Sequence, residues 1–162
     1  MKSLVVYYSL DGNTRFIAQC IAKELNADIL ELKTKKQPPS KGFLKYLVGG
    51  AGVVLKRKPE LVNKKININK YDHIFMGTPV WAGGFVPAFN TFASEYDISN
   101  KYLGFFACYA GDSAGKVFEK FKDIFPNNHF LGDISFREPL KHDSQRAGLR
   151  ASDWISLLPF KV

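Results

Sequence analysis

The stretch LVVYYSLDGNT, residues 4–14, joins a strand pattern to the start of a helix. Its first five residues are continuously apolar or aromatic, which is typical of a strand that is buried on both faces. Gly12 permits a tight turn, and Asn13 or Thr14 can cap the helix that the next residues predict. A buried strand that runs through a glycine turn into a helix indicates an α/β fold.

The same alternation of strands and amphipathic helices continues along the chain. Segments 29–33 and 129–136 alternate apolar and polar residues, so we expect them at the edges of the sheet. The pattern predicts a single domain over residues 1–162, an α/β three-layer sandwich whose five-stranded parallel sheet has strand order 2-1-3-4-5 and helices on both faces. The expected strands are 4–8, 29–33, 73–77, 103–110 and 129–136, and the expected helices are 14–26, 85–96, 117–125 and 144–158, with a further helix near 41–56.

Composition narrows the class of protein. A chain of 162 residues that is 46% hydrophobic suits one globular domain, and its apolar runs are far shorter than the roughly 20 residues of a membrane span. The N-terminus MKSLVVYYS has no signal-peptide pattern, so we expect a cytoplasmic protein without a membrane anchor. Cys20 and Cys108 are expected to be reduced core residues. The three histidines lack the spacing of metal ligands, so no metal site is expected.

The positive charge is concentrated in one segment. The net charge is +8, yet residues 33–70 alone contain eleven Lys or Arg against a single acid, Glu60. A solvated surface is one interpretation of this segment. The alternative is a docking face for an acidic protein, an anionic substrate or nucleic acid.

Three turns follow predicted strands at the sheet edge where such folds bind ligands, namely 9–14, 78–84 and 109–115. The first, SLDGNT, offers hydroxyl, amide and backbone N–H groups at a helix N-terminus, which suits a phosphate group. The second lies within GTPVWAGG (77–84) and places Trp81 directly after a buried strand. A large aromatic side chain there can form one wall for a flat ring.

The third turn lies within CYAGDSAG (108–115), which fits the G-x-S-x-G pattern of a serine nucleophile. Ser113, Asp133 and His142 also follow one another in the chain order of α/β-hydrolases. However, Asp133 falls inside a predicted strand, and a hydrolase leaves SLDGNT and Trp81 without a role. A serine hydrolase using Ser113 is therefore kept only as the weaker alternative.

Together, the three turns resemble the phosphate loop and the two ring-binding loops of the flavodoxin family. They occur in the same order after LVVYY, HIFMG and LGFF, and the resemblance covers essentially the whole chain. It is closest to short-chain members, because the fifth strand has no long insertion. The resemblance implies non-covalent FMN, with its phosphate held by the first turn. The implied binding residues are Ser9, Leu10, Asp11, Gly12, Asn13 and Thr14, then Thr78, Pro79, Val80, Trp81, Ala82 and Gly83, then Cys108, Tyr109, Ala110, Gly111, Asp112 and Gly115.

The chain departs from the family pattern at three points. Asp11 stands where the family usually has threonine, so its carboxylate must point away from the phosphate or lower the affinity for it. The third turn lacks the usual stacking tyrosine beyond its glycines, and Tyr109 lies earlier in the sequence. Electron-transfer flavodoxins are typically acidic, whereas this chain has an isoelectric point near 9.5.

The expected function is electron transfer by bound FMN between redox partner proteins. Acidic partners would dock on the basic 33–70 segment, and no catalytic side chain is expected. The alternative is an NAD(P)H-dependent quinone or flavin reductase, in which the same segment could contact the phosphates of NADPH. Nucleic-acid binding is not expected, because the aromatic residues follow core stripes and do not alternate with the lysines.

Overall fold

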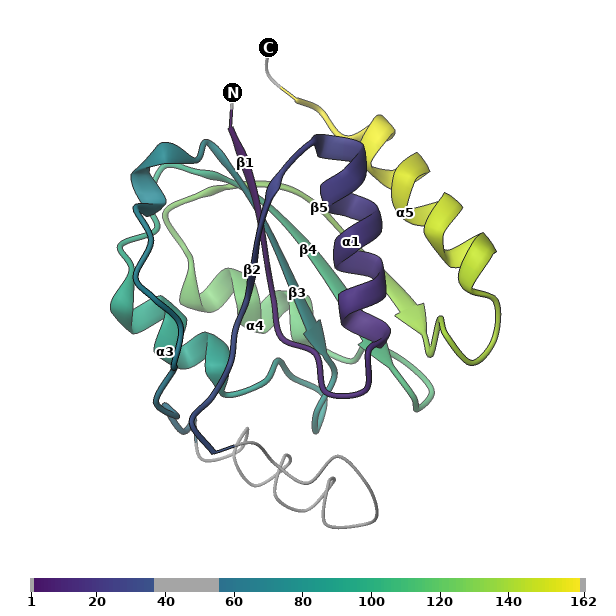
Figure 1. Cartoon of the computed structure of the whole chain (residues 1–162), viewed down its shortest axis with the longest axis horizontal. Helices are drawn as coiled ribbons and strands as arrows, with labels where there is room; N and C mark the ends of the chain where they lie inside the picture. The colour runs from purple at the N-terminus through teal and green to yellow at the C-terminus, as the bar shows by residue number, and fades with distance from the viewer. Residues whose placement is uncertain (1, 37–55, 161–162) are drawn as a thin grey trace.

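The computed structural model describes residues 2–36 and 56–160, which form one parallel sheet with helices on both sides (Figure 1). The sheet has the order β2-β1-β3-β4-β5, so the predicted strand order is confirmed. The predicted edge strands are also the observed ones. The strands are β1 (Ser3–Tyr7), β2 (Asp28–Glu31), β3 (His73–Pro79), β4 (Tyr102–Tyr109) and β5 (His129–Arg137). The helix expected near 41–56 lies outside the described residues.

Two pairs of helices cover the two faces of the sheet (Figure 1). Helices α1 (Asn13–Leu25) and α5 (Ser144–Leu157) lie on one face, where Ile17 and Ile21 pack with Phe106. Helices α3 (Ala88–Glu95) and α4 (Val117–Ile124) lie on the other, where Phe89 and Phe121 pack in a second core cluster. A short 3-10 helix, η1 (Ile68–Lys70), precedes β3. The pattern of apolar residues therefore predicts both layers correctly.

Glycine and phenylalanine alternate between the two central strands. Gly77 on β3 pairs with Phe106 on β4, and Phe75 on β3 pairs with Gly104 on β4. A Cβ added at Gly77 would lie 2.0 Å from the Phe106 ring, and one at Gly104 would lie 2.6 Å from the Phe75 ring. Each ring therefore occupies the space over the opposite glycine, which lets two large side chains pack flat against the sheet.

The carboxyl ends of β1, β3 and β4 meet at one edge of the sheet, at the bottom of Figure 1. The three turns singled out in the sequence leave the sheet there. Strand β3 runs to Pro79, two residues beyond the predicted end, so Thr78 and Pro79 belong to the strand. Among the described residues, no helix is long and apolar enough to cross a membrane.

Candidate functional site

The first turn is built around Ser9 and Gly12. The Ser9 hydroxyl oxygen accepts hydrogen bonds from the backbone N–H groups of Gly12 and Arg15, each at 3.2 Å. Gly12 has a backbone φ of +94°, a conformation that L side chains rarely adopt, and it directly precedes α1. The Arg15 guanidinium forms an ion pair with Glu31 on β2, which also raises the pKa of Arg15. The turn therefore gathers backbone N–H groups at the start of a helix, where Ser9 binds two of them, and its basic side chain is already paired.

Two side chains at the start of α1 serve different purposes. The Asn13 side-chain oxygen accepts a hydrogen bond from the backbone N–H of Leu140 at 3.0 Å, which ties α1 to the turn before α5. The Thr14 hydroxyl is fully buried and has no hydrogen-bond partner among the described residues. A buried polar atom without a partner is rare and costs free energy. Thr14 thus leaves one hydrogen-bonding group unused at this turn.

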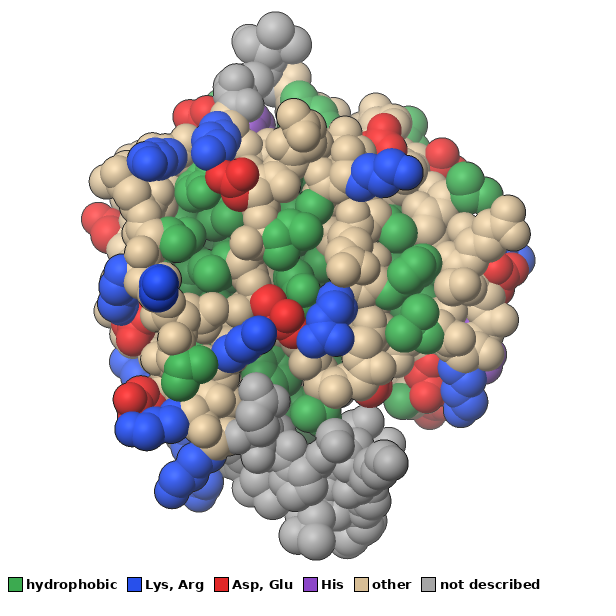
Figure 2. Space-filling model, viewed as in Figure 1, with side chains coloured by type: hydrophobic (Ala, Val, Ile, Leu, Met, Phe, Trp, Pro, Cys, Tyr) green, Lys and Arg blue, Asp and Glu red, His purple; other side chains and the backbone are tan. Residues whose placement is uncertain are grey.

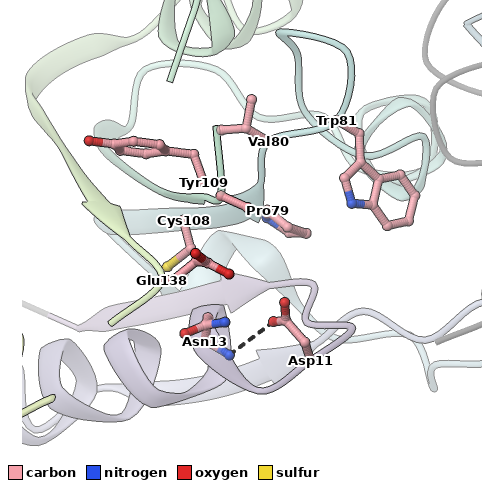
Figure 3. Close-up of a pocket in the computed structure, with 9 residues that line it drawn as sticks. Asp11, Asn13, Pro79, Val80, Trp81, Cys108, Tyr109 and Glu138 are labelled. Carbon is pink, nitrogen blue, oxygen red and sulfur yellow. Dashed lines mark hydrogen bonds between the residues drawn. The ribbon is translucent and has the colours of Figure 1, made fainter. Parts of the chain in front are cut away.

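Asp11 does not point away from the site. It lines the cavity between the turns, and Figure 3 shows its carboxylate on the cavity side. One of its oxygens accepts a hydrogen bond from the backbone N–H of Asn13 at 3.2 Å. That N–H is one of the helix-start donors that an anion would use. The Asp11 carboxylate therefore lies beside the start of α1, where its negative charge would oppose a bound anion.

The second turn is a tight hairpin that presents Trp81. The backbone N–H and C=O groups of Trp81 exchange hydrogen bonds with those of Gly84, at 3.0 and 2.9 Å. The two central residues, Ala82 and Gly83, have φ values of +46° and +67°, as a type I′ turn requires. Trp81 is half-buried, and its ring packs edge-on against Tyr8 with 5.7 Å between centroids. The indole is therefore held in place while one part of it faces the cavity.

The third turn approaches the second through its last glycine. A Cβ added at Gly115 would lie 3.2 Å from the Cα of Gly83, so the two turns are in close contact. Gly111 and Asp112 are exposed and lie outside the cavity lining. The Ser113 hydroxyl oxygen accepts a hydrogen bond from the backbone N–H of Gly115 at 3.2 Å. Ser113 therefore stabilises the turn in the way that serine commonly does.

The three turns enclose one small cavity (Figure 3). Cys108 lies at its floor and is buried, which raises the pKa of its thiol to about 12, with a smaller raising effect from Asp11. The neighbouring Thr14 hydroxyl acts in the opposite direction, although the two groups do not meet hydrogen-bond geometry. The thiol therefore stays protonated at neutral pH and is not a nucleophile. The lining residues are Asp11, Asn13, Pro79, Val80, Trp81, Cys108, Tyr109, Ala110 and Glu138.

Comparison with known proteins places this site in a family. A sequence description of flavodoxins matches residues 2–144. The chain belongs to the flavodoxin family. No curated protein matches it. A flavoprotein in complex with FMN from Lactobacillus acidophilus is 22% identical, with a TM-score of 0.72 over 90% of this chain and 98% of that one.

Two further solved structures have the same fold as this flavodoxin-family chain. A candidate flavoprotein from Bacteroides eggerthii is 22% identical, with a TM-score of 0.80 over 99% of both chains. A WrbA-like flavodoxin from Agrobacterium tumefaciens is 17% identical, with a TM-score of 0.58 over 96% of both. At these identities the likeness concerns the fold.

Not every residue that the family resemblance implies lies on the cavity. Thr78 is fully buried; its hydroxyl donates to the Pro79 carbonyl oxygen at 2.9 Å and accepts from the backbone N–H of Val86 at 3.1 Å. Its side chain therefore fixes the path of the chain after β3. Leu10 packs against the core, and Ala82 and Gly83 form the tip of the hairpin beside the cavity.

Sequence reasoning missed the turn that follows β5. Glu138 lines the cavity from this turn, and its carboxylate pairs with Lys141 at 3.3 Å. The backbone N–H of Leu140 binds Asn13, as described above. The sequence could have indicated this turn. Because β5 is predicted as a parallel strand, its carboxyl end must lie at the same edge of the sheet as the carboxyl ends of β1, β3 and β4. A second carboxylate therefore faces the cavity besides Asp11.

The serine hydrolase alternative lacks its triad in this flavodoxin-family fold. Asp133 lies within β5 and pairs with Lys122 on α4 at 3.7 Å. His142 precedes α5, on the opposite side of the sheet, and its Nε2 lies 3.8 Å from a Glu138 oxygen. Within the described part of the chain, Ser113 makes no hydrogen bond to Asp133 or His142, and its Oγ accepts one from the backbone N–H of Gly115. The G-x-S-x-G pattern therefore forms a glycine-rich turn here. In the described residues, neither Asp133 nor His142 is placed to act with Ser113 as a catalytic triad.

Proposed function

We propose that this chain binds FMN non-covalently between its three turns and carries electrons between redox partners. The observation that carries the proposal is the convergence of the three turns on one cavity in a member of the flavodoxin family. When bound, the flavin supplies the redox chemistry, and the protein supplies binding, orientation and electrostatics. A cytoplasmic location stays a prediction from the sequence.

The residues present fit a phosphate at the first turn and a planar ring at the other two. The unpartnered Thr14 hydroxyl and the left-handed Gly12 lie where helix α1 begins, as an anion site at a helix start needs. Trp81, fixed against Tyr8, supplies an aromatic wall. Gly83 and Gly115 leave the space beside the hairpin free of side chains. Asp11 and Glu138 oppose a negatively charged ligand, so the affinity is expected to be modest.

The docking surface of the proposed carrier lies beside the Trp81 hairpin. Two lysines, Lys56 and Lys120, and one acid, Asp123, line a cavity of about 380 Å³ together with Ala82 of that hairpin. Helix α3 fixes this part of the basic segment, because the Asn90 side chain donates to the Arg57 carbonyl oxygen at 3.1 Å. Figure 2 shows other Lys and Arg side chains along the edge where residues 56–70 run. An acidic partner that docks there would meet the aromatic end of the cofactor site.

The test is direct FMN binding followed by a mutation series. FMN fluorescence is expected to be quenched on titration with the purified chain. Thr14→Val should weaken binding by about tenfold, because one hydrogen bond to a charged group is lost, whereas Ser113→Ala should weaken it only slightly. The absence of quenching by the wild-type chain would contradict the proposal.

The same protein distinguishes a carrier from the NAD(P)H-dependent reductase alternative. Loaded protein is mixed with NADPH in a stopped-flow instrument, and flavin absorbance is followed. A carrier is expected to keep its absorbance over seconds and to lose it when a reduced partner protein is added. Rapid bleaching by NADPH alone would instead assign the chain to the reductases.

A further inference from the structure

A second, larger groove lies on the other side of Tyr109 from the cofactor cavity. It has a volume of about 490 Å³ and runs between the exposed edge of β5 and the first turns of α5. Three arginine side chains line it: Arg137 at the end of β5, and Arg146 and Arg150 on α5. A volume of several hundred Å³ is typical of a small-molecule site. None of the three arginines was singled out in the sequence.

The arginines face the groove without carboxylate partners. No ion pair of Arg137, Arg146 or Arg150 occurs within residues 2–36 and 56–160. The one carboxylate that lines the groove belongs to Asp143, and it already accepts a hydrogen bond from the backbone N–H of Arg146 at 2.9 Å. Three guanidinium groups against one engaged carboxylate give the groove an excess of positive charge.

The Arg150 side chain is held in place by its contacts with β5. The Arg150 guanidinium lies over the ring of Phe136, 5.0 Å from its centroid, and also contacts the Ser135 carbonyl oxygen at 3.5 Å. Such stacking limits the freedom of the side chain and leaves N–H groups for a ligand. Phe136 itself is buried in the sheet. The groove therefore has one cationic group held by contacts, Arg150, as well as two exposed ones, Arg137 and Arg146.

Tyr109 connects the groove to the cofactor cavity. It ends β4 and lines both spaces, and Figure 3 shows its ring directed away from Trp81. A ligand in the groove would therefore contact the residue that forms the far wall of the cofactor cavity. The groove is on the β5 side of that cavity, whereas the Lys56 surface is on the Trp81 side.

We propose that this groove binds the phosphate group of a small organic phosphate such as a nucleotide. Planar guanidinium groups match phosphate oxygens in paired hydrogen bonds, and a concave site of this size fits a nucleotide better than it fits a flat protein surface. The proposal does not depend on FMN binding, because the groove and the first turn are separate. It adds an anion site that the proposed carrier function does not require.

The test is calorimetric titration of the purified chain at low ionic strength, with and without added FMN. The probes are inorganic phosphate, pyrophosphate, NAD⁺, NADP⁺ and a glutamate-rich peptide. The variant Arg137→Gln/Arg146→Gln removes two charges that have no partner in the described structure. The control Lys23→Gln/Lys64→Gln removes two exposed charges elsewhere on the surface. Loss of binding in the control would indicate an effect of net charge alone.

Wild type and control are expected to bind pyrophosphate or NADP⁺, and the arginine variant to bind at least about tenfold more weakly. Tighter binding of NADP⁺ than of NAD⁺ would identify a terminal phosphate monoester, and equal binding would identify the shared pyrophosphate. The proposal is overturned if no phosphate probe binds, if the arginine variant binds as well as wild type, or if only the peptide binds. It is also overturned if the arginine variant loses affinity for FMN, because the groove would then belong to the cofactor site.

Discussion

Asp11 places a carboxylate where a phosphate group would use the start of α1. Its oxygen already occupies the backbone N–H of Asn13, and its charge repels a second anion. Asp11→Thr is therefore expected to tighten FMN binding by about tenfold, or roughly 1.4 kcal/mol, because it removes the repulsion and frees the N–H. Fluorescence titration of apoprotein measures the affinity.

Asp112→Thr serves as the control for Asp11. It removes the same charge from the third turn, where the side chain is exposed and lies outside the cavity lining. Its affinity for FMN is expected to stay close to that of wild type. Unchanged or weaker binding by Asp11→Thr would show that the Asp11 carboxylate is compatible with the phosphate.

His73 makes stability depend on pH. It is 2% exposed, its Nε2 has no hydrogen-bond partner among the described residues, and its ring stacks on Tyr102 at 5.1 Å. Burial lowers the pKa of His73 below its usual 6.5. The unfolded chain then binds a proton more readily than the folded one. The free energy of unfolding should fall as pH drops below 6.5, by at most about 1.4 kcal/mol per pH unit.

Urea unfolding at pH 7.5 and pH 5.5 measures this slope. His73→Gln is expected to lose some stability at both pH values and to flatten the dependence between them. His142→Gln is the control, because His142 is exposed and precedes α5. A slope that persists in His73→Gln would place the responsible group elsewhere.

At the scale of elements, the pairing of β3 with β4 depends on two glycines. A methyl group at Gly77 would overlap the ring of Phe106, which cannot move because it is fully buried. Gly77→Ala is expected to lower the free energy of unfolding by about 3 kcal/mol, the upper range for overpacking. Thermal or urea unfolding measures the change.

A double-mutant cycle separates overpacking from a backbone effect. If the clash with Phe106 is the cause, Gly77→Ala should cost much less in the background of Phe106→Ala than in wild type. Gly111→Ala is a matched control, because a Cβ there meets nothing within 4 Å. Equal costs of Gly77→Ala in both backgrounds would contradict this explanation.

The elements themselves were predictable, because each is encoded by a short-range pattern. The run 4–8 and the stripe of Ile17 and Ile21 depend on neighbouring residues alone, and the predicted boundaries of these two elements differ from the structure by one residue at each end. The strand order follows from which strands alternate and which are continuous. The family predicted from the three turns is confirmed by the comparison.

The details of the site were less predictable, because they depend on contacts between distant segments. The bond between Leu140 and Asn13 joins residues 127 positions apart, and the cavity position of Glu138 depends on how β5 ends. The direction of Asp11 was left open by the sequence and is set by its bond to Asn13. The glycine pairing with Phe106 is a cross-strand property that no local pattern reveals.

For the whole molecule, the net charge of +8 is distributed unevenly along the chain. Most of the excess lies in residues 33–70, where Lys56 lines a cavity together with Ala82 of the Trp81 hairpin and is followed by Arg57 and Lys58. Elsewhere in the described part of this segment, Lys35 forms an ion pair with Glu60, and Lys65 forms one with Glu95. These pairs offset part of the positive charge away from the hairpin. The positive potential is therefore expected to be strongest near the aromatic end of the cofactor site.

Reoxidation of the FMN-loaded, reduced protein by small charged oxidants tests this asymmetry. Anionic ferricyanide should react faster than a cationic cobalt ammine complex, and its rate should fall as salt is added. Lys56→Glu/Lys58→Glu should slow ferricyanide by about threefold to tenfold at low salt. Lys23→Glu/Lys64→Glu changes the net charge equally on surfaces away from the hairpin, so it should have a smaller effect. If both variants slow ferricyanide equally, total charge determines the rate, and the Lys56–Lys58 surface has no special role in docking.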